Sequence, residues 1–209
     1  MPTANQNQRQ NRAIQTRKRL LEAARVVFAR DGFEHASLQD IATLAGKTRG
    51  AFYDNFQNKE DVFFAIFEED LKRDKALMGE SMRQSSTLEG RLDLLAQCLF
   101  DFIQDKERAL LSAEFKTYAI RSPHHRKRLA DLHAAIRMGC SLPELDEVIP
   151  ELEQQPESVK REMSLAISGI LDGLSLNVHF DPGSANPQHL KNYLRWCIGE
   201  AIRNALQER

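Results

Sequence analysis

The sequence predicts an all-α protein, and three observations support that fold class. Leu occurs 25 times and Ala 22 times but Val only 6 times, which favours helices because Leu and Ala lose little conformational freedom there. No proline lies between Pro2 and Pro123, so helices can run through this stretch unbroken. Apolar residues recur at helical spacing, and nothing in this stretch alternates like a half-buried strand. The length of 209 residues permits one domain or two.

The first predicted helix ends at Gly32. This glycine can take the left-handed backbone conformation that commonly follows a helix, and Phe33 can then fold back onto the last turn. The inward positions of the helix are spaced at helical intervals: Leu20, Leu21, Ala24, Val27 and Phe28.

Two short helices joined by a glycine turn come next. The Ser37 hydroxyl can cap a helix over residues 38–44, and the Thr48 hydroxyl can cap a second one over residues 48–56. Between them Gly46 supplies a tight turn. The second short helix has two phenylalanines one turn apart, and its other face is polar or small. The residues expected to face inward are Leu38, Ile41, Ala42, Phe52 and Phe56.

A longer fourth helix begins after Asn58 and fades toward Gln84. Asn58 can cap it, and Glu60 and Asp61 complement the positive end of the helix dipole. Further helices are predicted over residues 88–103, 107–121, 124–138, 157–180 and 187–206. A mobile acidic loop with at most a short turn of helix is predicted over residues 141–158.

The formal net charge of −1 conceals an uneven distribution. Residues 1–50 carry nine Lys and Arg against four Asp and Glu, whereas the remainder carries 20 basic and 26 acidic residues. A basic end on a mildly acidic body indicates contact with a polyanion. We expect a flexible basic arm over residues 1–13; the alternative is that the early cations belong only to a solvated tail and first turn.

Two short helices joined by a glycine turn and braced by a longer first helix have the arrangement of a helix-turn-helix. A helix fits the major groove of DNA, so side chains on its exposed face can reach base edges. Small residues at Gly50 and Ala51 would allow a close backbone approach, and Arg49 could bind guanine through two hydrogen bonds, worth about 1–3 kcal/mol of discrimination. A three-helix bundle that binds no nucleic acid would show the same spacing, but the basic amino end favours DNA binding.

The segment from Thr16 to Glu69 resembles the DNA-binding domain of the TetR family of bacterial transcriptional regulators, over about a quarter of the chain. The resemblance rests on Ala36-Ser37-Leu38-Gln39-Asp40-Ile41-Ala42, Ala45-Gly46 and Thr48-Arg49-Gly50-Ala51-Phe52-Tyr53, followed by Phe56 and Asn58-Lys59-Glu60-Asp61.

The resemblance implies an all-α homodimer with a helix-turn-helix DNA-binding domain over residues 14–74, its motif over residues 37–56. A helical ligand-binding and dimerisation domain would follow over residues 75–209. The resemblance further implies that Ser37 and Thr48 contact phosphates, that residues 49–51 read bases, and that Tyr53 and Lys59 clamp the DNA backbone. The candidate DNA-binding residues are Ser37, Lys47, Thr48, Arg49, Gly50, Ala51, Tyr53, Asn55 and Lys59.

Two positions depart from the family pattern. Lys47 follows the glycine turn, where the family usually has a small apolar residue, and it could add a phosphate contact. Asp54-Asn55 follows the aromatic pair, where a histidine is common. Asp54 would repel phosphates unless it accepts from a cytosine amino group or caps locally, so the operator sequence does not follow from relatives.

The last two predicted helices have amphipathic stripes. The first stripe comprises Val159, Met163, Ala166, Ile170 and Leu174, and the second comprises Leu190, Leu194, Cys197, Ile198, Ala201, Ile202 and Ala205. Gly169 and Gly173 each cost a helix about 1 kcal/mol, from which we infer that a neighbouring helix approaches closely there. In the family this helix pair forms a four-helix bundle with its copy. The alternative is a stripe that packs only within its own chain.

A ligand cavity is expected among the middle helices. Candidate lining residues, each of which could equally be plain core, are Phe67, Cys98, Phe102, Phe115, Tyr118 and Met138. The run from His124 to Arg128 could be a metal site, a second nucleic-acid patch or the solvated start of a helix; adjacent histidines point to different helix faces and make a poor pair of ligands.

Other features exclude several classes of protein. Cys98, Cys140 and Cys197 lie far apart, which indicates buried thiols in a reducing cytosol rather than disulfides or a zinc module. No motif of an enzyme is present, and no metal or cofactor is expected. No apolar run or signal peptide is evident, so we expect a cytoplasmic protein without a membrane span.

The functional hypothesis is a ligand-responsive transcriptional regulator. It would be a repressor that binds a palindromic double-stranded operator as a homodimer and is released by a small molecule. The alternative is a helical small-molecule-binding or interaction module without sequence-specific DNA binding, whose affinity for DNA would lack a steep salt dependence.

Overall fold

The computed structural model describes residues 4–122, 127 and 149–207. These residues form helices joined by turns, with no strand among them, which confirms the predicted all-α class. The chain divides into two compact units, Met1–Glu69 and Asp70–Arg209. Helix α4 (Lys59–Met82) contributes its first part to one unit and its remainder to the other.

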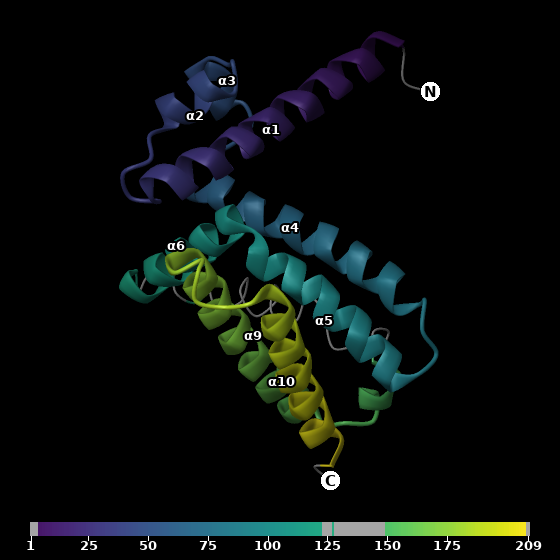
Figure 1. The fold of residues 1–209 in the computed structure, drawn as a ribbon. Coiled ribbons are helices and arrows are strands. Elements are labelled where there is room, and N and C mark those ends of the chain that lie inside the picture. Colours follow the sequence, from purple (N-terminus) through teal and green to yellow (C-terminus); the bar gives the residue numbers. More distant parts are fainter. Residues whose placement is uncertain (1–3, 123–126, 128–148, 208–209) are drawn as a thin grey trace. The chain divides into compact units, whose positions relative to one another are not determined.

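The first unit contains α1 (Ala4–Asp31), α2 (Leu38–Leu44), α3 (Arg49–Tyr53) and the beginning of α4 (Figure 1). Its core is aromatic. The rings of Phe28, Phe33 and Phe63 contact one another, with centroid separations of 4.6–5.5 Å. As predicted, Gly32 has a left-handed φ of 75°, and Phe33 packs back against Phe28 on the last turn of α1.

The structure differs from the sequence expectation at two helix ends of this unit. Residues 4–13 belong to α1 rather than to a separate flexible arm, because neither glycine nor proline interrupts the chain between residue 4 and residue 31. Helix α3 ends at Tyr53, three residues earlier than predicted, and Asp54 and Asn55 form a turn. Phe56 is nevertheless buried, as expected.

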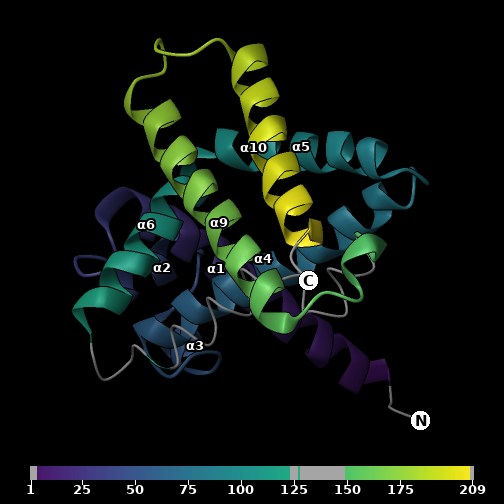
Figure 2. The same ribbon diagram turned by 90° about the horizontal axis from the view of Figure 1, so that it is seen from below.

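The second unit is built around α5 (Leu88–Gln104), α9 (Glu157–Phe180) and α10 (Pro187–Gln207), which pack on one another. Helix α6 (Lys106–Arg121) packs against α9 (Figure 2). A short 3₁₀ helix, η1 (Pro150–Leu152), carries Leu152 into the core next to Ile149. Part of the predicted acidic loop is therefore anchored. The predicted helix over residues 124–138, with Met138 and most of the His124–Arg128 run, and residues 141–148 lie outside the described residues.

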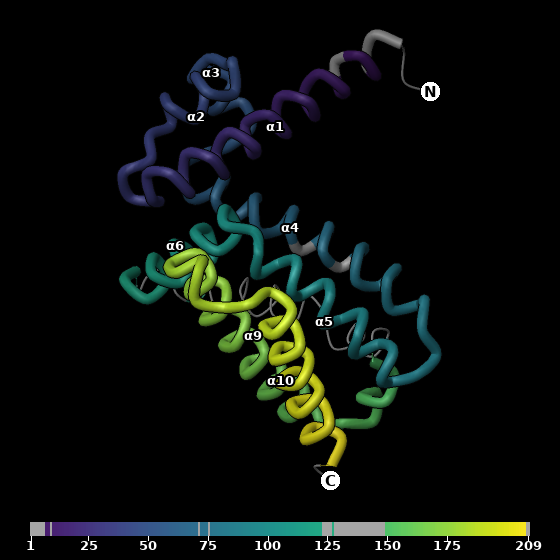
Figure 3. The backbone as a smooth tube through the Cα atoms, viewed as in Figure 1, coloured from purple at the N-terminus to yellow at the C-terminus, as the bar shows by residue number. Residues whose placement is uncertain are grey.

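The structure locates two features of the last helices. Leu194, Ile198, Ile202 and Ala205 of α10 lie in the unit's own core against α5 and α9, so this part of the stripe packs within its own chain, which is the alternative given above. A Cβ added at Gly169 or Gly173 would meet nothing within 4 Å, so the neighbouring helix inferred from the sequence is not among the helices described for this chain. In Figure 3, α9 and α10 run side by side. Gly169 and Gly173 of α9 are exposed.

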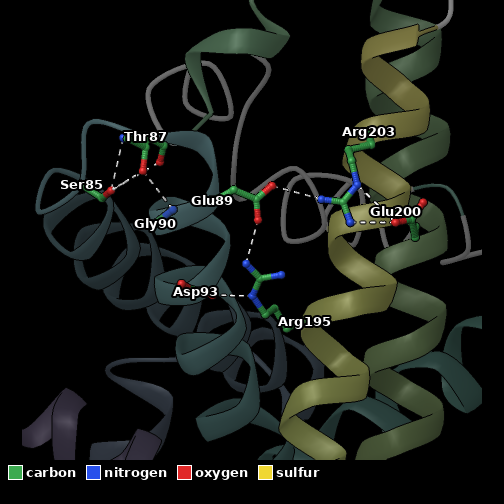
Figure 4. A network of polar contacts seen from close by, with 8 residues as sticks. All are labelled: Ser85, Thr87, Glu89, Gly90, Asp93, Arg195, Glu200 and Arg203. Carbon is green, nitrogen blue, oxygen red and sulfur yellow. Dashed lines mark hydrogen bonds and ion pairs between the residues drawn. The ribbon is translucent and has the colours of Figure 1, made fainter.

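An ion-pair network joins α5 to α10 (Figure 4). Glu89 accepts from the guanidinium groups of both Arg195, at 2.8 Å, and Arg203, at 3.3 Å. Arg195 also binds Asp93, one turn further along α5, and Arg203 also binds Glu200 at 2.7 Å. The carboxylates of Asp93 and Glu89 raise the pKa of Arg195 by hydrogen bonding.

Candidate nucleic-acid interface

Side-chain caps start both short helices of the first unit. The Ser37 hydroxyl accepts a hydrogen bond from the Asp40 N–H at 3.0 Å and donates to the Asp40 carboxylate at 2.6 Å. The Thr48 hydroxyl accepts from the Ala51 N–H at 3.2 Å. These bonds satisfy amides that a helix start leaves without partners, so both predicted caps are confirmed. Between the caps, Gly46 makes the turn with a left-handed φ of 63°.

Helix α3 is anchored from behind by two phenylalanines. Phe52 is fully buried and Phe56 is 4% exposed, and their ring centroids lie 5.6 Å apart. Arg17 of α1 covers this pair, with its guanidinium carbon 4.3 Å from the centre of the Phe56 ring. Its Nη1 also donates to the Asn55 carbonyl at 3.2 Å. Sequence reasoning placed Arg17 only in a basic run, and the contact spans too many residues for a local pattern to reveal.

The opposite face of α3 is open to solvent. Thr48, Arg49, Gly50 and Tyr53 are exposed, and Tyr53 retains 49% of its accessible surface. Arg49 Nη2 lies 3.2 Å from the Tyr53 hydroxyl, to which it donates, and its guanidinium carbon lies 5.7 Å from the centre of the tyrosine ring. Arg49 and Tyr53 are one helical turn apart and therefore share a face. The structure thus brings together the donor and the ring that were predicted to meet DNA.

Lys59 has contacts that the sequence did not reveal. Its ammonium donates to the carbonyls of Glu34 at 2.9 Å and Ala36 at 3.3 Å, and lies 4.7 Å from the centre of the Phe33 ring. Burial lowers the pKa of Lys59. An ammonium has three donor hydrogens, and the two carbonyls account for two of them. Lys59 therefore stabilises the loop between α1 and α2 through its bonds to the Glu34 and Ala36 carbonyls, and one donor hydrogen is left for the predicted DNA contact.

The remaining candidates are partly buried. Lys47 and Ala51 lie at intermediate depth, as do Ser37 and Asn55. The Asn55 side-chain amide donates to the Ala51 carbonyl at 2.8 Å, and so holds the turn at the end of α3. Asp54 is exposed directly after Tyr53. A carboxylate at this edge of the surface disfavours phosphate close by.

Comparison with known proteins assigns this geometry to a family. The sequence model of the bacterial regulatory proteins of the tetR family matches residues 20–66, which cover the end of α1, both short helices and the start of α4. Residues 20–66 are therefore similar to the TetR family. The resemblance stated from the sequence motifs is thereby confirmed.

Two curated relatives of this chain are transcriptional repressors. The repressor AcnR of Corynebacterium diphtheriae is 36% identical over 80 residues, which are 38% of this chain and 40% of that protein. The nicotine-responsive repressor HdnoR of Paenarthrobacter nicotinovorans is 26% identical over 185 residues, 84% of this chain and 89% of that protein. The chain thus spans about two fifths of AcnR, a match confined to part of each protein.

Two solved structures of transcriptional regulators share the fold over nearly the whole chain. A putative regulator from Mesorhizobium loti superposes with a TM-score of 0.69 at 16% identity, covering 92% of this chain and 98% of that one. The regulator FadR from Bacillus subtilis, solved in complex with stearoyl-CoA, superposes with a TM-score of 0.69 at 22% identity, covering 88% of this chain and 98% of that one.

The ligand-binding candidates are distributed over both units. Phe67 lies in the first unit, where its ring meets that of Phe63 edge-on at 5.2 Å. In the second unit Phe115 is buried, whereas Cys98 and Tyr118 are partly buried. Phe102 lies under the Arg108 guanidinium, 4.1 Å from ring centre to guanidinium carbon. Cys98 and Cys197 are free thiols, and Cys140 lies outside the described residues.

Two features are absent from the described part of the chain. No group of three or more metal-ligating side chains comes together there. None of the helices described there combines the length and the apolar character that crossing a membrane requires.

Proposed function

We propose that this chain is a DNA-binding transcriptional regulator, a repressor that a small molecule releases from its operator. The exposed Arg49–Tyr53 pair on a helix anchored from behind by Phe52 carries this proposal. A rigid anchor fixes where the exposed face lies, and a guanidinium on that face can bind guanine through two hydrogen bonds. The family model that matches residues 20–66 describes bacterial regulatory proteins, which supports the proposal.

The roles of the contact residues follow from their exposure and partners. We propose that Arg49, Gly50 and Ala51 approach base edges, and that Tyr53 and Thr48 contact the sugar-phosphate backbone. Gly50 gives space for that approach, since the atom nearest to an added Cβ would be Thr48 Oγ1 at 3.7 Å. Ser37 at the start of α2 and Lys47 in the turn between α2 and α3 would add phosphate contacts, and Lys59 would do so with its third donor.

A second copy of the chain would supply a second DNA-binding unit. We propose that the homodimer forms through the exposed apolar side chains of α9 and α10, with Gly169 and Gly173 allowing close approach of the partner helix. Because one half-site lies about 34 Å from the next on the same side of the duplex, a twofold dimer fits a palindromic operator. The apolar side chains concerned are Leu165, Leu176, Phe180, Tyr193 and Trp196.

An effector would act on the spacing of the two recognition helices in the dimer. We propose that a small molecule bound in the second unit favours a dimer whose recognition helices do not match two half-sites, which is a shift between existing populations. Cys98, Phe102, Phe115 and Tyr118 are the described candidates for its contacts in that unit. HdnoR, by its name, responds to nicotine, which sets a precedent for this kind of control.

The proposal is tested by selecting duplexes from a random pool with the full-length protein. We expect a palindrome to be enriched, and its affinity to fall steeply as salt rises. The double variant Arg49→Ala with Tyr53→Ala should bind that palindrome at least about a hundredfold more weakly, from a loss of roughly 1–3 kcal/mol per contact. No enrichment, or binding that is insensitive to salt, would favour the alternative of a helical ligand-binding module.

A further inference from the structure

The amino-terminal part of α1 extends beyond the packed part of the first unit. Helix α1 begins at Ala4, but its first buried side chain among those described is Leu20. Residues 4–19 span about 24 Å along a helix axis. In Figures 1 and 2 this part of α1 projects past α2 and α3 of the same unit. Apart from Arg17, which contacts Phe56 and Asn55, and the half-buried Thr16, the described side chains of this part are exposed, so packing within the unit accounts for little of it.

This extension carries only positive charge. Residues 4–19 contain no Asp or Glu and five cations, at positions 9, 12, 17, 18 and 19. Arg17 is committed to Phe56 and Asn55, and Lys18 lies 3.9 Å from Glu22. Arg12 and Arg19 are exposed and meet no carboxylate among the described residues.

The helix dipole does not account for these charges. Its influence falls off within the first turn, and the first turn of α1, residues 4–7, contains neither an acid nor a cation. The cations begin at position 9 and form no run of compensating pairs with acids within residues 4–19, so an external polyanion would relieve their mutual repulsion. These cations also precede residue 20, where the match to the family begins.

We propose that residues 4–19 bind the sugar-phosphate backbone of duplex DNA that flanks the site read by α3. The inference rests on the proposed function. Arg17 ties α1 directly to the turn that ends α3, so the extension leaves the unit beside the recognition helix. Its length of about 24 Å corresponds to roughly 7 base pairs of duplex at 3.4 Å each. The contact adds affinity but no sequence information, because phosphates are the same at every step.

The experiment compares two duplexes that contain the selected palindrome, one with about 2 and one with about 12 flanking base pairs on each side. The first flank is shorter than the extension and the second is longer. The test variant is Arg12→Gln, Lys18→Gln and Arg19→Gln together, since Gln keeps a similar helix propensity. The matched control removes three exposed cations of the second unit, Lys72→Gln, Arg83→Gln and Lys106→Gln.

The wild-type protein should bind the long duplex about tenfold more tightly than the short one at about 0.15 M salt. The test variant should lose this preference, and its salt slope on the long duplex should fall by about 0.9 for each phosphate contact removed. The control should retain both. Equal wild-type affinity for the two duplexes, or a test variant that keeps the preference, would overturn only the proposal that residues 4–19 bind flanking DNA. Failure to select any duplex would overturn the proposed function and the extension with it.

Discussion

At the scale of single residues, neighbours in sequence have opposite tasks in α3. Phe52 is completely buried, whereas Tyr53 retains half of its surface and meets Arg49. This division follows from the helical period, which turns consecutive side chains by about 100°. A helix of five residues cannot hold itself together, so its position depends on the anchor behind it.

The pair therefore permits a matched comparison. Phe52→Ala should lower the free energy of unfolding by about 3–5 kcal/mol, because it empties a buried aromatic site. Tyr53→Ala should leave stability within about 0.5 kcal/mol, since the side chain is half exposed, and should instead weaken DNA binding. Urea unfolding and duplex titration of both variants measure the two effects. Equal destabilisation by the two substitutions would contradict the placement of α3.

At the scale of elements, the sequence predicted those features that depend on contacts between residues close together along the chain. The caps by Ser37, Thr48 and Asn58 join residues three apart, and Gly32 acts on its own turn, so sequence pattern was enough to predict them. The bond from Arg17 to Asn55 spans 38 residues, and that from Lys59 to Glu34 spans 25. No local spacing encodes such contacts, because they depend on how the helices come together.

The stripe on α10 shows a second limit. Its spacing predicted an apolar face correctly, but the period of a stripe does not state whether the partner helix belongs to the same chain or to a copy. Ile198 and Ile202 pack inside their own unit, while Tyr193 and Trp196 on other faces of α10 remain exposed. The same applies to Gly169, whose lack of a side chain leaves open space within this chain.

The cap of α3 is a testable element. Thr48→Ala removes the hydroxyl that accepts from the Ala51 amide and should cost about 1 kcal/mol. Thr48→Ser keeps the hydroxyl and should cost much less. Thermal unfolding of the three proteins compares them directly. Should the alanine and serine variants melt together, the capping bond would not be what starts α3.

The network between α5 and α10 is expected to be weak and sensitive to salt. Glu89 is 60% exposed, and exposed ion pairs contribute only about 0.2–1 kcal/mol each. Glu89→Gln removes the acceptor charge shared by Arg195 and Arg203, so unfolding should become easier by no more than about 1–2 kcal/mol at low salt. In about 1 M NaCl the difference should shrink through screening. A difference that persists unchanged at high salt would show that charge is not the cause.

At the scale of the whole molecule, the proposed homodimer joins two DNA-binding units through a surface that the single chain leaves open. Leu165 is 56% exposed on α9 and Trp196 is 60% exposed on α10. Leu165→Glu with Trp196→Glu should therefore yield folded monomers that bind the palindrome far more weakly. Ile120→Glu on α6, which is 75% exposed, is the matched control and should remain dimeric. Sedimentation equilibrium reports the mass of each; a double variant that stays dimeric would place the interface elsewhere.

Whether the exposed side of α3 reads bases can be measured through the base preference of Arg49→Ala. Selection of random duplexes with the wild type and with this variant, at one salt concentration, gives two preference profiles. We expect the variant to lose about 1–3 kcal/mol of discrimination at one position in each half-site, the two positions being related by the twofold axis, and to keep the rest of the profile. An unchanged profile, or a uniform loss of affinity at every position, would contradict this expectation.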